Sequence, residues 1–189
     1  MRRDQLEHAI RTACQIIGHD EVVVVGSQSI LGTLSEEDLP LEATMSVEVD
    51  VLPLAEDNEE TARLADLIEG VAGELSPFED LHGYSIDGVD LLTSALPEGW
   101  RARLVEVQNA NTCSPGSERQ FTGWCLDKED LCVAKLCALR VKDVNFVGAL
   151  LRSGLVDAEV LVARLPTVPS RYADRVEPAL TWLSGVHRA

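Results

Sequence analysis

The sequence predicts an α/β fold of the α+β type, with a small mixed β-sheet flanked by helices and a helical C-terminal part. Two valine-rich stretches, residues 22–25 and 46–53, are typical of strands in such a sheet. After residue 126, apolar residues recur at helical spacing instead. We therefore predict an α/β core over residues 1–121 and a helical part packed on it over residues 122–189.

The first elements follow from the spacing of apolar residues. Residues 4–17 predict an amphipathic helix, which Gly18 ends. Residues 21–25 are a short run rich in valine, typical of a strand buried on both faces. Residues 27–34 predict a short helix, and residues 46–53 predict a second strand.

The remaining elements are predicted in the same way. Residues 59–75 return to helical spacing, a stretch rich in turns is predicted after them, and short strands are predicted over residues 84–89 and 103–108. Residues 109–123 have the composition of a loop. A series of helices follows, with Asp127 and Asp130 as candidate N-caps, Gly154 as a stop, and a last helix near residues 171–186.

Composition and charge limit the classes of function. The 189 residues carry a net charge of −16, which disfavours non-specific binding to a phosphate backbone. The five cysteines form no Cys-x-x-Cys pair and the four histidines are scattered, so a zinc site has little support. No signal peptide or membrane span is visible in the sequence, and we expect a reduced, cytoplasmic setting without membrane partners.

The end of the first strand carries a candidate phosphate site. In the stretch "VVVVGSQSILG", residues 22–32, an apolar strand runs into Gly26 and Ser27 before a short helix begins. Glycine lets a ligand approach the backbone closely, and amides at a helix start attract phosphate. The alternative interpretation is an ordinary turn.

The second strand carries two carboxylates. In "SVEVDVLPL", residues 46–54, Glu48 and Asp50 alternate with valines, so both side chains leave one face of the strand. Two close carboxylates repel each other unless a cation lies between them, and Mg²⁺ takes one or two carboxylates together with substrate phosphates. A solvent-facing edge strand, which needs no metal, is an equally good interpretation of these residues alone.

Taken together, these two motifs resemble the signature of the polymerase-β-type nucleotidyltransferases. The later segment "LDKEDLCVAKLCALRVKDVNFVGALL", residues 126–151, is similar to the helical half of nucleotidyltransferase-like proteins, namely the AbiEii and MenT toxin group and the DUF6036 family. The resemblance covers roughly residues 20–55 and 122–152, and residues 56–121 match only loosely.

The resemblance implies roles for individual residues. One set of residues is expected to bind a nucleoside triphosphate, and another is expected to carry out catalysis. Glu48 and Asp50 of the catalytic set are also the expected metal ligands. The nucleotide-binding set is Gly26, Ser27, Ser46, Lys135 and Arg140, and the catalytic set is Glu48, Asp50 and Asp143. From the residues alone, Lys135 could equally extend from a core-facing helix, and Arg140 and Asp143 could form an ordinary surface pair if one helix continues through both.

The chain departs from the family pattern at four points, one of which is a set of extra residues around "SEEDLPLEA", residues 35–43, between the Gly-Ser turn and the acids. Glu48 stands where the pattern usually has Asp, and a basic residue expected just before it is absent from residues 43–45. The third strand acid of the superfamily has no clear counterpart, and Glu106 is a candidate for it.

The leading hypothesis is a nucleotidyltransferase that depends on Mg²⁺ or Mn²⁺ and moves a nucleoside monophosphate from a triphosphate to an acceptor. The residues leave the acceptor open between an RNA end, a protein hydroxyl and a small molecule. The resemblance implies a toxin-like role against tRNA, with an antitoxin partner. The alternative is a catalytically degenerate binding module that has kept the fold. A structural zinc protein is a third hypothesis, which the spacing of the cysteines and histidines disfavours.

Overall fold

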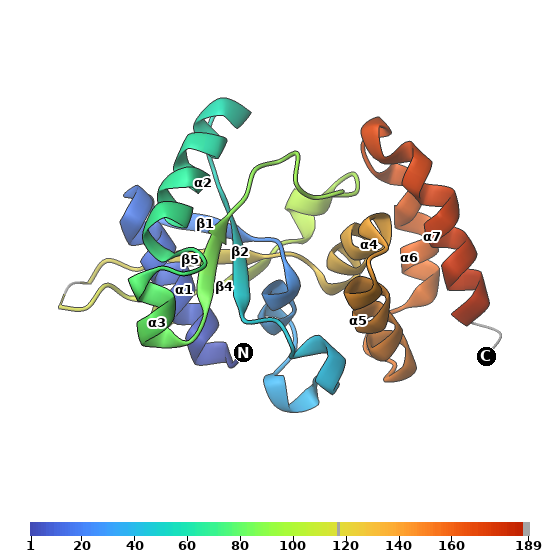
Figure 1. Cartoon of the computed structure of the whole chain (residues 1–189), viewed down its shortest axis with the longest axis horizontal. Coiled ribbons are helices and arrows are strands. Elements are labelled where there is room, and N and C mark those ends of the chain that lie inside the picture. Colours follow the sequence, from blue (N-terminus) through green and yellow to red (C-terminus); the bar gives the residue numbers. More distant parts are fainter. Residues whose placement is uncertain (117, 187–189) are drawn as a thin grey trace.

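The fold is organised by one mixed β-sheet, which consists of β1 (Glu21–Val24), β2 (Glu48–Pro53), β3 (Ser85–Gly88), β4 (Val105–Val107) and β5 (Thr122–Cys125). The computed structural model describes residues 1–116 and 118–186. Residues 117 and 187–189, which fall in the predicted loop and the predicted helical part, lie outside the described residues. The strand order is β3-β2-β1-β5-β4, and the α+β class is confirmed (Figure 1).

The central strand β1 has neighbours on both sides. It pairs antiparallel with β2 and parallel with β5, while β3 pairs parallel with β2 at one edge and β4 pairs antiparallel with β5 at the other. Val22, Val23 and Val24 are fully buried, which confirms a strand covered on both faces. This position places the end of β1 directly beside β2.

Three helices accompany the N-terminal half of the chain, namely α1 (Arg3–Ile17), α2 (Asn58–Ala72) and α3 (Pro77–His82). α1 and α2 contact each other and the sheet, and they are seen together with α3 beside the strands in Figure 1. α1 buries the apolar face predicted from its spacing, and Gly18 ends it with a φ of 74°. This left-handed conformation costs glycine little, which explains the stop.

The C-terminal helices gather at the other end of the molecule (Figure 1). They are α4 (Lys128–Ala138), α5 (Val141–Arg152), α6 (Ala158–Arg164) and α7 (Ala173–Val186). Asp127 caps α4 as predicted, since its side chain accepts a hydrogen bond from the amide of Asp130. Asp130 itself is fully buried and pairs with Arg103 and Arg164, so it ties α4 to two other segments instead of capping a helix.

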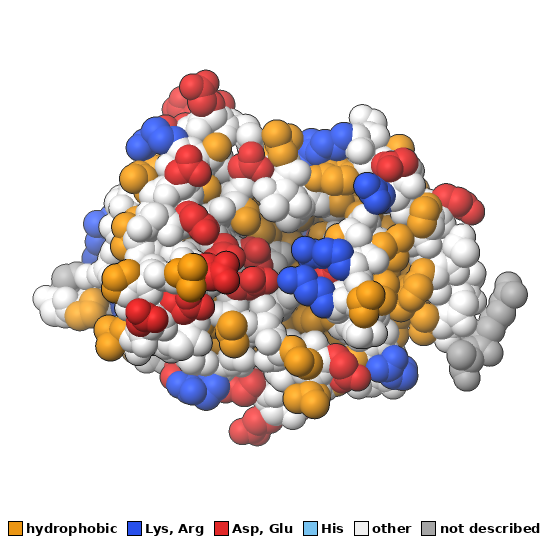
Figure 2. All heavy atoms as spheres, viewed as in Figure 1, with side chains coloured by type: hydrophobic (Ala, Val, Ile, Leu, Met, Phe, Trp, Pro, Cys, Tyr) orange, Lys and Arg blue, Asp and Glu red, His pale blue; other side chains and the backbone are white. Residues whose placement is uncertain are grey.

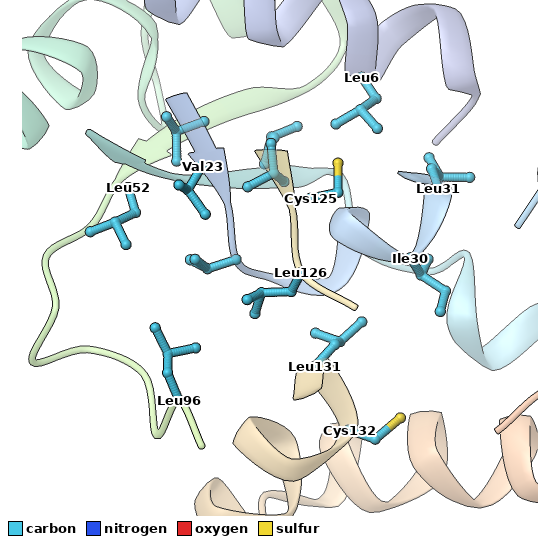
Figure 3. Packing of buried hydrophobic residues seen from close by; sticks show 14 of the residues in the cluster. Leu6, Val23, Ile30, Leu31, Leu52, Leu96, Cys125, Leu126, Leu131 and Cys132 are labelled. Carbon is cyan, nitrogen blue, oxygen red and sulfur yellow. The ribbon is translucent and has the colours of Figure 1, made fainter. Parts of the chain in front are cut away.

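One apolar core connects the sheet with the C-terminal helices. Figure 3 shows Leu96 and Leu126 beside Leu131 and Cys132 of α4, between the strands and the helices. The cysteines are all free, and burial raises the pKa of the Cys14 and Cys125 thiols to about 12. In the part of the chain that the structure describes, no helix combines the length and apolar character needed to cross a bilayer.

Short 3-10 helices fill the connections. They are η1 (Ser27–Gly32), η2 (Glu36–Asp38), η3 (Leu41–Ala43), η4 (Trp100–Arg103), η5 (Ala110–Thr112), η6 (Leu165–Thr167) and η7 (Ser170–Tyr172). The predicted short helix over residues 27–34 is therefore a 3-10 helix that ends at Gly32.

Two predictions about the elements need correction. α3 lies in a stretch that we predicted as turns, and β5 begins inside the predicted loop of residues 109–123 and joins the sheet. Arg140 and Asp143 do not share one continuous helix, because α4 ends at Leu139, whose φ is 51°, and Arg140 is the N-cap of α5. The division of the chain at residue 121 stays a prediction, with β5 on the sheet side of the fold.

Candidate active site

Gly26 and Asp50 are in direct contact at the end of β1. The backbone amide of Val25 donates a hydrogen bond to the carbonyl of Asp50 over 3.0 Å, so the two strands stay paired up to the turn. A Cβ atom built on Gly26 would lie 1.5 Å from Asp50 Oδ2. A side chain at Gly26 would require the Asp50 carboxylate or the turn to move, and the Gly-Ser turn and the strand acids meet as the sequence predicts.

The two acids of β2 share one face of the strand and open into a cleft. Val49 and Val51 are fully buried on the other face, whereas the side chain of Glu48 is 39% exposed and Asp50 is partly buried. The cleft has a volume of about 290 Å³. Its lining includes Gly26, Ser27, Glu48, Asp50, Lys135 and Arg140. Figure 2 shows acidic and basic side chains facing one another across the middle of this side of the molecule.

A third acid, which our sequence analysis missed, lies beside Asp50. Asp87 of β3 is the cross-strand neighbour of Asp50, and adjacent strands lie about 4.8 Å apart. Ser85 donates a hydrogen bond to Asp87 Oδ1 over 3.0 Å, so both side chains lie on one face of β3. Glu106, the predicted third acid, is exposed on β4 at the opposite edge of the sheet and is not part of the cleft.

The electrostatics of the cleft raise the pKa of Asp50. Burial is the largest cause, and the charges of Glu48 and Asp87 add to it, while Lys135 and Lys142 act in the opposite direction. The result is a pKa of about 6 for Asp50. Burial is also the largest cause of the raised pKa of Asp87, to which Glu48 contributes.

These carboxylates suit a divalent cation shared with a phosphate. Among the described residues none donates a hydrogen bond to the carboxylate of Asp50, which leaves its oxygens available. The described part of the chain contains no group of three or more His, Cys, Asp or Glu residues that could hold a metal ion by themselves. A site with only one or two protein ligands suits Mg²⁺, because this ion takes one or two carboxylates and completes its shell with water and phosphate oxygens.

Lys135 of α4 reaches the turn at the end of β1. Its Nζ donates a hydrogen bond to Ser27 Oγ over 2.9 Å and lies 4.4 Å from the centre of the Phe146 ring. Burial lowers the pKa of Lys135, and the charges of Asp143 and Asp50 partly offset this effect. The ammonium group is thus held beside the candidate phosphate turn, where the sequence predicts it.

Asp143 holds Lys135 and Arg140 in place. Its side chain is fully buried and accepts hydrogen bonds from Arg140 Nε over 2.6 Å and from Lys135 Nζ over 3.3 Å. Burial alone would raise the pKa of Asp143, but the hydrogen bond from Arg140 and the charge of Lys135 outweigh it and the pKa is lowered. Both oxygens of Asp143 are thus engaged by the two cations, and its catalytic role stays a prediction.

A second cavity of about 380 Å³ adjoins the first. The two cavities share Ser27, Glu48, Lys135 and Lys142 in their linings, and the second also includes Ser46, Met45 and Phe146. The predicted nucleotide-binding residue Ser46 therefore lines this second cavity, and its hydroxyl lies 3.5 Å from the amide of Glu48.

A basic side chain approaches Glu48 from another part of the fold, although none stands just before it in the sequence. Lys142 of α5 approaches Glu48 Oε1 to 3.5 Å. The sequence signal for Lys142 is its place in a compact basic cluster, residues 140–142. A second basic cluster, residues 100–103, contributes Arg103 to the ion pair with the buried Asp130.

One of the three comparisons with known proteins found a match. A family model described as a nucleotidyltransferase of unknown function (DUF6036) matches residues 4–175, a range that contains every residue of the cleft. A search among curated proteins and a search among solved structures found no match.

Proposed function

The chain belongs to the DUF6036 family of nucleotidyltransferases, and on this premise we propose that it transfers a nucleoside monophosphate from a nucleoside triphosphate to an acceptor. The observation that carries the proposal is the contact between Gly26 and the carboxylate of Asp50. It brings a turn that a phosphate can approach and a strand acid that can bind a cation into one cleft.

The phosphates of the substrate would lie against Ser27, Lys135 and Arg140. The Ser27 hydroxyl can donate to a phosphate oxygen, and the two cations, fixed by Asp143, would offset the charge of the triphosphate. Since η1 is a 3-10 helix of only six residues, these side chains would supply most of the attraction for the anion.

Glu48 and Asp50 are the residues that would hold Mg²⁺ or Mn²⁺. When bound, such an ion offsets the charge that develops on the phosphate oxygens during an in-line displacement. Glu48 is one methylene longer than the usual Asp, and its partial exposure leaves it free to adjust toward a ligand.

Asp87 is the best candidate for the general base. In the transfer, the acceptor hydroxyl would attack the α-phosphorus, its proton would pass to Asp87, and the bond to pyrophosphate would break. The raised pKa of Asp87 supports this role, because a base works best when its pKa approaches the working pH. With Asp87 beside Asp50 on the neighbouring strand, the lack of a third acid no longer favours the degenerate binding module.

For the acceptor we propose an RNA end, with tRNA as the first candidate, or a protein hydroxyl. The net charge of −16 disfavours an extended RNA footprint, so contacts to RNA would be confined to the acceptor end. Kinship with the AbiEii and MenT toxins, and with it an antitoxin partner, is part of the proposal that rests on the resemblance alone.

The direct test is to incubate the protein with each α-³²P-labelled triphosphate, Mg²⁺ and a cell lysate, and to separate RNA from protein. The proposal predicts label in one of these fractions, and loss of that label with Glu48→Gln or Asp50→Asn. If the wild-type protein labels nothing while it binds triphosphate, the degenerate binding module is the better description.

A further inference from the structure

Three basic side chains face the candidate site, and they differ in what holds them. Lys135 and Arg140 share the buried carboxylate of Asp143. Lys142 instead pairs with Glu48, and among the described residues Glu48 is its only hydrogen-bond or ion-pair partner. The partner of Lys142 is therefore a residue that we propose as a metal ligand.

The pair between Lys142 and Glu48 is loosely held. Their side chains are 63% and 39% exposed and lie 3.5 Å apart, whereas Lys135 is 11% exposed and Asp143 is fully buried. Exposed ion pairs of this kind contribute little to stability and exchange readily, because water screens them and both side chains stay flexible. Lys142 can leave Glu48 without disturbing the fold.

We propose that Lys142 is an exchangeable counter-ion, which neutralises Glu48 in the free protein and moves to the phosphates when a divalent cation binds. Lys142 lines both cavities of the site, so its ammonium group can reach either side of Glu48. This inference rests on the proposed function, because it requires both a cation at Glu48 and a polyphosphate beside it.

The exchange follows from the charges in the cleft. A divalent cation at Glu48 and Asp50 repels the ammonium group of Lys142, while the incoming phosphates attract it. The metal therefore frees a cation for the phosphates, and the phosphates in turn stabilise the displaced position of Lys142. Binding of the two ligands is thereby coupled, and each ligand raises the affinity for the other.

The variant Lys142→Met tests both the pairing of Lys142 with Glu48 in the free protein and its contact with the phosphates in the complex. Without the competing ammonium group, the ligand-free protein should bind Mn²⁺ about two- to fivefold more tightly, as measured by electron paramagnetic resonance. Binding of inorganic tripolyphosphate in the presence of Mg²⁺, measured by calorimetry, should weaken about tenfold. A merely structural role for Lys142 would weaken both, so opposite shifts are the signature of the exchange.

Arg152→Met is the matched control. Arg152 lies on the same helix, roughly 15 Å further along it, and pairs with Glu42 at 3.4 Å. Its loss removes one positive charge from α5 but leaves Glu48 paired, so both affinities should stay close to those of the wild type.

The outcomes also separate this inference from the proposed function. If the wild type binds Mn²⁺ and tripolyphosphate but Lys142→Met binds Mn²⁺ no more tightly, the exchange is wrong and the proposed function stands. If the wild type binds neither Mn²⁺ nor tripolyphosphate, both the exchange of Lys142 and the proposed function are wrong.

Discussion

The carboxylate of Asp50 occupies the space that a side chain at Gly26 would need, since a Cβ there would lie 1.5 Å from Asp50 Oδ2. This contact joins two segments that are separated in the sequence but adjacent in the sheet, and it fixes the Asp50 carboxylate at the turn. The candidate site is therefore built on paired strands, which position a side chain more accurately than a loop does.

We predict that Gly26→Ala displaces Asp50 and weakens Mn²⁺ binding. The added methyl group must move the carboxylate or the turn, which should lower the free energy of unfolding by about 1–3 kcal/mol. Urea denaturation and Mn²⁺ titration measure the two effects.

Gly70→Ala is the control, because no atom lies within 4 Å of a Cβ at this position of α2, and it should stabilise the protein by about 0.5–1 kcal/mol. Unchanged Mn²⁺ binding in Gly26→Ala would show that the contact with Gly26 does not position Asp50 for the metal ion.

We predict that Asp50 makes the metal-free protein less stable as the pH rises. Its pKa is about 6 when folded, against an ordinary value of 3.8, so the folded state holds this proton more tightly than the unfolded state. Its contribution is fully present below pH 4 and is lost as the pH rises through about 6, a change of up to about 3 kcal/mol. Asp50→Asn should remove this dependence.

The measurement is urea denaturation of the wild type and Asp50→Asn in EDTA at pH 4.5 and 7.5. Asp50→Asn should gain stability relative to the wild type between the two values, since other titrating groups cancel in the difference. A difference that does not change with pH would contradict the raised pKa.

We predict that Asp143→Asn weakens tripolyphosphate binding and also destabilises the fold, by about 3 kcal/mol, because it leaves Lys135 and Arg140 without their shared anion. Asp130→Asn is a matched control, since Asp130 is equally buried and also holds two cations, Arg103 and Arg164. It should lose similar stability but keep the tripolyphosphate affinity, which calorimetry on the folded proteins at low temperature measures. Equal losses of affinity in both variants would argue against a positioning role for Asp143.

We predict that Asp87→Asn lowers the rate of label transfer by about 10²–10⁴-fold while triphosphate binding changes little, as expected for loss of a general base. Single-turnover kinetics with saturating triphosphate separate the two effects. Glu106→Gln, at the opposite edge of the sheet, should behave like the wild type. A fall in affinity with an unchanged rate would assign Asp87 to binding instead.

The parts of the site that the sequence predicts are those with a local signal. A buried strand that ends in Gly26 and Ser27, and a strand with alternating Glu48 and Asp50, indicate one cleft because two such strands in a small sheet tend to be neighbours. Lys135 and Arg140 came from the resemblance, and the structure brings both to the cleft.

The parts that the sequence does not predict depend on tertiary geometry. Asp87 could be found only from the register of β3 against β2, which no local pattern in the sequence specifies. Lys142 reaches Glu48 because the chain turns at Leu139, which has a φ of 51°. Leucine rarely adopts this conformation, so the sequence, which has no glycine or asparagine at this position, does not predict the turn. The misassigned Glu106 has the right alternation but lies on the wrong edge strand.

Whether one cleft binds a divalent cation and a phosphate chain together can be decided by anomalous diffraction from a crystal grown with Mn²⁺ and a non-hydrolysable triphosphate analogue. We expect an anomalous peak about 2.1 Å from carboxylate oxygens of Glu48 and Asp50, with phosphate oxygens in contact with Ser27 and Lys135. A peak elsewhere on the protein, or an analogue bound away from residues 26 and 27, would contradict this expectation.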